Sequence, residues 1–100
     1  MSIEFVGMVF PNQWSETKGT RIGHKIDLDY LRYHARAHEY AGFDKVLIAS
    51  GPSSPDSTQI AAYLAQHTEQ LGFMIAHRPA LVTPNLAARS FATLDHTTGG

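Results

Sequence analysis

The dipeptide His77–Arg78 is the strongest candidate for chemistry in this chain of 100 residues. It follows a short apolar run, and an arginine at the end of a strand suits planar, two-pronged recognition of an anion. A salt bridge explains Arg78 equally well, and His77 can equally be a hydrogen-bonded core residue. We select Arg78 as the candidate anion ligand.

A second set of candidates, Asn12, Gln13 and Trp14, follows the first apolar run of the chain. Amide side chains can hydrogen-bond the edge of a heterocycle, and an indole ring can stack on its face. Ordinary loop chemistry, with Trp14 covering the rim of the fold, is the structural alternative. The position at the end of a strand favours function as strongly as structure.

The loop after the second apolar run contains Ser50, Ser53 and Ser54. It has neither the Gly-x-x-x-x-Gly-Lys pattern of a phosphate loop nor the Gly-x-Ser-x-Gly pattern of a nucleophile elbow. Ser54 can still donate a hydrogen bond to an anion or to an oxygenated intermediate. A turn serine that bonds its own backbone is the commoner explanation.

His34 and His38 are four residues apart, a spacing that can hold zinc on one face of a helix. The metalloprotease glutamate is missing from Ala35–Ala37, and no third ligand is evident. We therefore interpret both as histidines that pack or face solvent, and we expect no metal site.

These candidates must be positioned by alternating strands and helices. Short runs rich in Val, Ile and Phe predict buried strands, and capping residues followed by apolar positions at helical spacing predict helices. The expected strands are residues 3–10, 45–49 and 73–76, and the expected helices are residues 28–41, 57–69 and about 84–98.

Three strand–helix units in a row imply parallel strands joined by right-handed crossovers. Both a doubly wound sheet and an eightfold barrel begin in this way, and both bind ligands at the carboxyl ends of the strands. Three parallel strands alone leave two long unprotected edges. We therefore expect a fragment, or a chain that needs a further part to be stable.

Composition narrows the functional class. The formal net charge of −1 gives no sign of a nucleic-acid or acidic-membrane partner, and there is no run of 18 apolar residues. The absence of cysteine excludes disulfides, thiolate metal sites and a cysteine nucleophile within this chain. We expect a soluble, cytoplasmic protein.

Three motifs resemble the bacterial luciferase-like flavin monooxygenases, and most closely their alkanesulfonate monooxygenase branch. They lie at Leu47–Asp56, at His77–Ala80 and at Thr83–Asp95, where the Pro-x-x-Ala-Ala-Arg-x-x-Ala-Thr-Leu-Asp pattern is specific for the superfamily. The resemblance implies that residues 1–100 are the N-terminal portion of one (β/α)₈ TIM-type barrel domain, its first three βα units.

The resemblance also implies an activity. Reduced FMN, delivered by a separate NAD(P)H-dependent flavin reductase, would activate O₂ to remove sulfite from an organosulfonate and leave an aldehyde. We expect Ser54 to be catalytic, and a homodimer or homotetramer. The expected cofactor-binding residues are Asn12, Ser50, Ala76 and His77, and the expected substrate-binding residues are Gln13, Trp14 and Arg78. A deazaflavin-dependent oxidoreductase on the same barrel and a non-enzymatic flavin-binding or interaction protein are the alternatives.

The chain departs from the alkanesulfonate pattern in the second loop. In the alkanesulfonate-like pattern, a cysteine near the flavin occupies the position of Ser54, and an arginine occupies the position of Pro52. The resemblance implies that the family's main catalytic His, Tyr and Arg residues lie beyond residue 100. Superfamily members also have a non-proline cis peptide, which the resemblance places around Ile75–Ala76.

Overall fold

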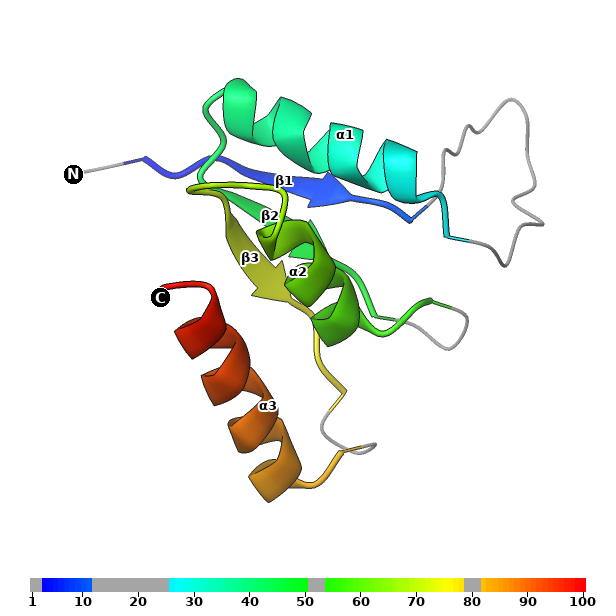
Figure 1. Ribbon diagram of the computed structural model, residues 1–100, viewed down its shortest axis with the longest axis vertical. Coiled ribbons are helices and arrows are strands. Elements are labelled where there is room, and N and C mark those ends of the chain that lie inside the picture. Colours follow the sequence, from blue (N-terminus) through cyan, green and yellow to red (C-terminus); the bar gives the residue numbers. More distant parts are fainter. Residues whose placement is uncertain (1–2, 12–25, 51–53, 79–81) are drawn as a thin grey trace.

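A three-stranded sheet and three helices make up this computed structural model, which describes residues 3–11, 26–50, 54–78 and 82–100 (Figure 1). Strands and helices alternate along the chain, and the strands lie in the order β1-β2-β3. Both strand pairs are parallel. The elements are β1 Val6–Val9, α1 Leu28–Tyr40, β2 Lys45–Ile48, α2 Ser57–Ala65, β3 Gly72–Ile75 and α3 Pro84–Thr97. The predicted series of three βα units is confirmed.

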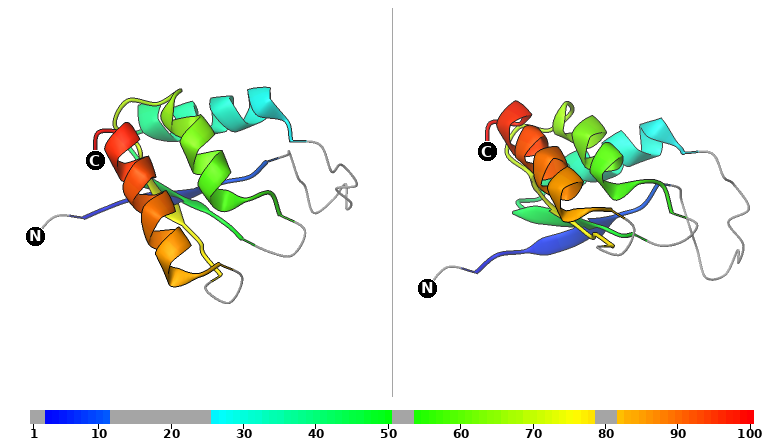
Figure 2. Two further views of the ribbon diagram at one scale, coloured as in Figure 1. Left: turned by 60° about the horizontal axis from the view of Figure 1, so that its bottom comes forward. Right: turned by 90° about the horizontal axis from the view of Figure 1, so that it is seen from below.

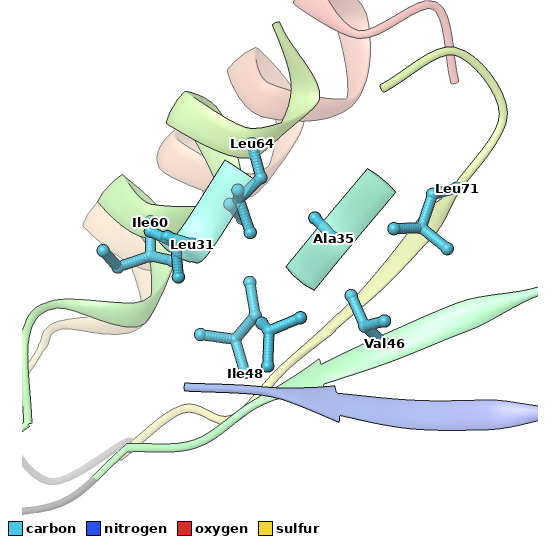
Figure 3. Packing of buried hydrophobic residues seen from close by; sticks show 9 residues of the cluster. Leu31, Ala35, Val46, Ile48, Ile60, Leu64 and Leu71 are labelled. Atoms are coloured by element: carbon cyan, nitrogen blue, oxygen red, sulfur yellow. The ribbon is translucent and has the colours of Figure 1, made fainter. Parts of the chain in front are cut away.

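All three helices lie on one face of the sheet (Figure 2). Because side chains alternate along a strand, Val9, Val46 and Ile48 point toward these helices and are buried. The core joins them to Leu31 of α1 and Leu64 of α2 (Figure 3). Burial of apolar side chains against both helices holds the strands in register.

The predicted helix starts are confirmed by their capping bonds. The side chains of Asp27, Asp56 and Thr83 each accept a hydrogen bond from the backbone N–H three residues later, at 3.0, 3.0 and 3.3 Å. Each bond satisfies a donor that has no partner within the first turn. Pro84 occupies the first turn of α3, where a missing N–H costs nothing.

All six elements are within a few residues of the predicted ranges, and three of the differences are informative. Strand β1 covers only Val6–Val9, because those are the residues that pair with β2. Helix α2 ends at Ala65 rather than Glu69, where the chain turns into a segment whose backbone N–H groups bond a side chain of α1. Strand β3 begins one residue earlier than predicted, at Gly72.

The other face of the sheet is free of helices in the described part of the chain. Met8, Leu47 and Met74 occupy one row of paired positions across the strands. They lie on the face opposite the buried Val9, Val46 and Ile48 by strand alternation, and Met74 is 46% exposed. This apolar face is consistent with the interior of a barrel.

Among the helices of the described ranges, none has the length and apolar character of a membrane-spanning segment.

Candidate functional site

The ends of β2 and β3 bring two of the sequence candidates to the same level. Ile48 of β2 pairs with Ile75 of β3 in a parallel register. Ser50 and His77 each lie two residues beyond this pair, at the carboxyl edge of the sheet. This is the edge at which sheets and barrels of parallel strands bind their ligands.

A pocket of about 340 Å³ opens at this edge, between the first halves of α2 and α3. Four of the candidates chosen from the sequence contribute to its wall: Ser50, Ala76, His77 and Arg78. Arg78 and His77 are exposed, so a ligand can reach both side chains from solvent. The first turn of α2 and the first half of α3 supply the remaining lining residues: Asp56, Ser57, Thr58, Gln59, Val82, Leu86, Ala87, Ser90 and Phe91.

The pocket has a polar side and an apolar side. Val82, Leu86 and Phe91 form apolar wall at the start of α3. The rings of His77 and Phe91 pack edge to face, with their centroids 5.4 Å apart and an angle of 79° between their planes. This contact places the imidazole beside the apolar wall.

The end of β3 is fixed by bonds on both sides of Ala76. Its N–H donates to the carbonyl oxygen of Ile48 at 3.0 Å, and its own carbonyl accepts from the Ser57 hydroxyl at 2.7 Å. Ser57 is 6% exposed and is the buried polar residue of the described chain. The pocket wall at Ala76 is therefore tied to both β2 and α2.

The remaining sequence candidates are Ser54 and three residues of the first loop. Asn12, Gln13 and Trp14 lie outside the described residues. Ser54 is exposed and is not among the described residues that line the pocket. The expected cis peptide around Ile75–Ala76 is wrong, since the described backbone has no cis peptide bond.

His34 and His38 belong to a separate aromatic column between α1 and β1. Their ring centroids are 4.6 Å apart, and Nδ1 of His38 donates to the carbonyl oxygen of His34 at 2.8 Å. Burial, reinforced by the neighbouring His38, lowers the pKa of the His34 imidazole. The His38 ring also packs edge-on against Phe43. The described residues contain no group of three or more side chains that could hold a metal ion. Both histidines pack between α1 and β1, as interpreted from the sequence.

Sequence reasoning missed the contribution of the helices to the pocket. The sequence pattern predicts only that capping residues and apolar positions form helices at residues 57–69 and 84–98, and it does not indicate that these helices line a site. The position of these residues in the sequence could have indicated their role. Residues that open a helix after such a loop lie at the same edge of the sheet as the carboxyl ends of the strands. Nothing in the sequence links Ser57 with the carbonyl of Ala76, which lies 19 residues away.

Comparison with protein families identifies the group. A family model described as luciferase-like monooxygenase matches residues 3–100. The three parallel strands alternating with helices are consistent with the first βα units of the barrel of that family. Enzymes of this family generally use reduced flavin. The chain belongs to the luciferase-like monooxygenase family.

Proposed function

We propose that the protein is a reduced-FMN-dependent monooxygenase that cleaves the C–S bond of an organosulfonate. The overall reaction converts R–CH₂–SO₃⁻, FMNH₂ and O₂ into R–CHO, HSO₃⁻, FMN and H₂O. One oxygen atom of O₂ enters the aldehyde and the other enters water, while the reduced flavin supplies two electrons. A separate NAD(P)H-dependent reductase supplies the reduced flavin in this proposal, and the enzyme assembles as a homodimer or homotetramer.

One observation carries the proposal. Ser50, Ala76, His77 and Arg78, chosen from separate segments of the sequence, line a single pocket at the carboxyl edge of the sheet. Their juxtaposition follows from the register of β2 and β3. Family membership supports the flavin and the oxygen chemistry, and the alkanesulfonate-like motifs support the sulfonate.

The chemistry of the pocket fits part of a flavin. Ser50 and His77 offer hydrogen-bonding groups next to an apolar wall that contains Phe91, which matches a planar ring with polar edges. Ser50, Ala76 and His77 would hold the cofactor, together with Asn12 of the first loop. When bound, reduced flavin supplies the electrons and activates O₂. The role of the protein is to orient the flavin and exclude water.

Arg78 is the proposed ligand of the sulfonate. A sulfonate remains an anion at neutral pH, and enclosing it removes its water, so fixed donors must compensate. The planar guanidinium can give two parallel hydrogen bonds to sulfonate oxygens. Gln13 and Trp14 are proposed to complete the substrate site from the first loop.

Ser54 is proposed to donate a hydrogen bond to the reacting oxygen. Its side chain is exposed, and it lies two residues before Asp56, the N-cap of α2. Replacement of Ser54 by Ala in the intact enzyme should lower the ratio of sulfite formed to O₂ consumed. An unchanged ratio would assign Ser54 to the turn alone.

The decisive experiment measures sulfite release from organosulfonates by the intact enzyme with reduced FMN and O₂. Arg78→Met should lower kcat/KM by roughly tenfold to a hundredfold, the value of a charge-assisted hydrogen bond. Arg78→Lys keeps the charge but loses the planar fork, so its loss should be smaller. The matched control is Arg89→Met, an exposed arginine of α3 outside the pocket. An unchanged kcat/KM in Arg78→Met would contradict the role of Arg78.

Anaerobic titration with reduced FMN and with a reduced deazaflavin separates the two cofactor classes. Binding of FMN with O₂-dependent turnover supports the monooxygenase. Binding of the deazaflavin alone would replace the proposal with a hydride-transferring oxidoreductase, and binding of neither would contradict both.

A further inference from the structure

We propose that Ser57 is a positioning residue for the pocket, acting through the carbonyl of Ala76. The inference rests on the proposed function for its effect on turnover, and on the structure alone for its effect on the backbone. Ser57 opens α2, and its hydroxyl donates to the carbonyl oxygen of Ala76 at 2.7 Å. His77 and Arg78 follow Ala76 directly.

Burial makes this hydrogen bond consequential. Ser57 is 6% exposed, so its hydroxyl is largely shielded from competing water, and Ala76 is half-buried at the wall of the pocket. A buried carbonyl that loses its donor retains the cost of desolvation. Without the Ser57 donor, we expect the backbone at Ala76 to shift toward the pocket, where its carbonyl can regain a partner, and such a shift displaces the residues that follow.

The backbone around Ala76 has two fixed points. Its N–H donates to the carbonyl oxygen of Ile48 at 3.0 Å, which continues the pairing of β3 with β2. The Ser57 bond fixes the other side of the same residue to α2. Without it, the segment that carries Arg78 leaves the sheet with one restraint instead of two.

Asp56 reinforces this arrangement from the helix side. Its carboxylate accepts the backbone N–H of Gln59 at 3.0 Å and thereby fixes the first turn of α2. Ser57 is held within that turn, so its hydroxyl approaches Ala76 from a rigid element. Rigid elements place functional groups more precisely than loops do.

Hydrogen exchange in the intact enzyme tests the backbone part of the inference without any substrate. Ser57→Ala should speed exchange of the Ala76 N–H by roughly three- to tenfold, the value of one neutral hydrogen bond. Ser57→Thr keeps the hydroxyl and should restore protection, whatever its added methyl costs in thermal stability. Unchanged exchange at Ala76 in Ser57→Ala would overturn the inference.

Thr68→Val provides a matched control just beyond the other end of the same helix. The Thr68 hydroxyl also donates to a backbone carbonyl, that of Leu64, at 3.1 Å, but it lies away from the pocket. This variant should lower stability while leaving exchange at Ala76 and kcat/KM unchanged. If it alters both as Ser57→Ala does, the effect is general destabilisation and positioning by Ser57 is refuted.

A double-mutant cycle tests whether Ser57 acts through Arg78. Ser57→Ala should lower sulfonate kcat/KM by roughly three- to tenfold in the native background, and by less than about twofold when Arg78 is already Met. Equal losses in both backgrounds would overturn positioning through Arg78. If the wild-type enzyme does not turn over any sulfonate, the proposed function fails, and the exchange measurements still decide the positioning role of Ser57.

Discussion

The carboxylate of Glu39, near the end of α1, accepts the backbone N–H of Gln70 at 2.6 Å. The same oxygen also accepts the N–H groups of Leu71 at 2.8 Å and Glu69 at 2.9 Å. Three consecutive donors in the turn before β3 thus converge on one side chain from another helix. This arrangement joins the first βα unit to the third strand at the edge of the sheet opposite the pocket.

Glu39→Gln should destabilise the intact enzyme by about 1.5–3 kcal/mol, the value of hydrogen bonds to a charged group. The amide of Gln keeps the shape of the side chain but loses the charge, and its NH₂ group cannot accept from the backbone N–H groups. Urea unfolding measures the change in free energy.

Glu4→Gln is the matched control for this substitution. Glu4 makes an exposed ion pair with Lys45 at 3.2 Å, and such pairs contribute little. A loss in Glu39→Gln no larger than that in Glu4→Gln would show that the three amide bonds add no net stability.

The stabilisation by Glu39 should depend on pH. Burial raises the pKa of the Glu39 carboxyl, but the hydrogen bonds from Gln70, Leu71 and Glu69 outweigh this effect and hold the pKa below its ordinary value of 4.5. A lowered pKa in the folded state means that the stabilisation is present above pH 4.5 and is lost as the pH falls through the folded-state pKa.

The stability difference between wild type and Glu39→Gln should therefore shrink as the pH is lowered below 4.5. Other carboxylates titrate equally in both proteins, so their contributions cancel in the difference. Urea unfolding over a pH series provides the measurement, and a difference that grows toward acid pH would contradict the lowered pKa of Glu39.

The fold could be predicted from the sequence because its signals are local. Asp27, Asp56 and Thr83 act within one turn of their helices, so a capping residue followed by an apolar face is sufficient to locate each start. The end of α2 could not be located in this way. It coincides with the turn whose N–H groups bond Glu39, a contact between residues about 30 positions apart in sequence.

The site was predictable only in part. Parallel strands fix which loops share an edge, and this is why Ser50 and His77 could be grouped before the structure was known. The depth of the pocket and the bond from Ser57 to Ala76 depend on how α2 and α3 pack on the sheet. No periodicity in the sequence encodes that packing.

Gly7→Ala should disrupt the packing of α1 on β1. A Cβ at Gly7 would collide with the imidazole of His38 and lie 3.2 Å from the ring of Phe43. The His38 ring cannot move freely, because its Nδ1 is bonded to the carbonyl of His34. We expect a loss of about 1–3 kcal/mol, which is typical of overpacking.

Gly72→Ala is the comparison for Gly7→Ala. There a new Cβ would lie 3.0 Å from Cγ of Lys45, on a side chain that can move, and 3.3 Å from the backbone oxygen of Asp44, so the contacts are less severe than at Gly7. Chemical unfolding should show a smaller loss than for Gly7→Ala. His38→Ala combined with Gly7→Ala should cost less than the sum of the two single losses, and simple additivity would exclude the predicted collision.

Substitution of Met74 by Lys on the open face of the sheet should benefit residues 1–100 produced alone and harm the intact enzyme. Met74 is 46% exposed beside Leu47, on the face that a complete barrel would enclose. Residues 1–100 produced alone should therefore self-associate through this face. Met74→Lys should reduce that association, as measured by light scattering.

In the intact enzyme the same substitution should be destabilising. Closure of the barrel places position 74 in a packed interior, where an unpaired ammonium costs several kcal/mol. Tyr40→Lys is the control, since Tyr40 is 95% exposed on α1 and the substitution should have little effect on stability. If Met74→Lys leaves the thermal stability of the intact enzyme unchanged, the face that carries Met74 is not the interior of a closed barrel. A lysine at position 74 would leave stability unchanged only if its ammonium group were in contact with water.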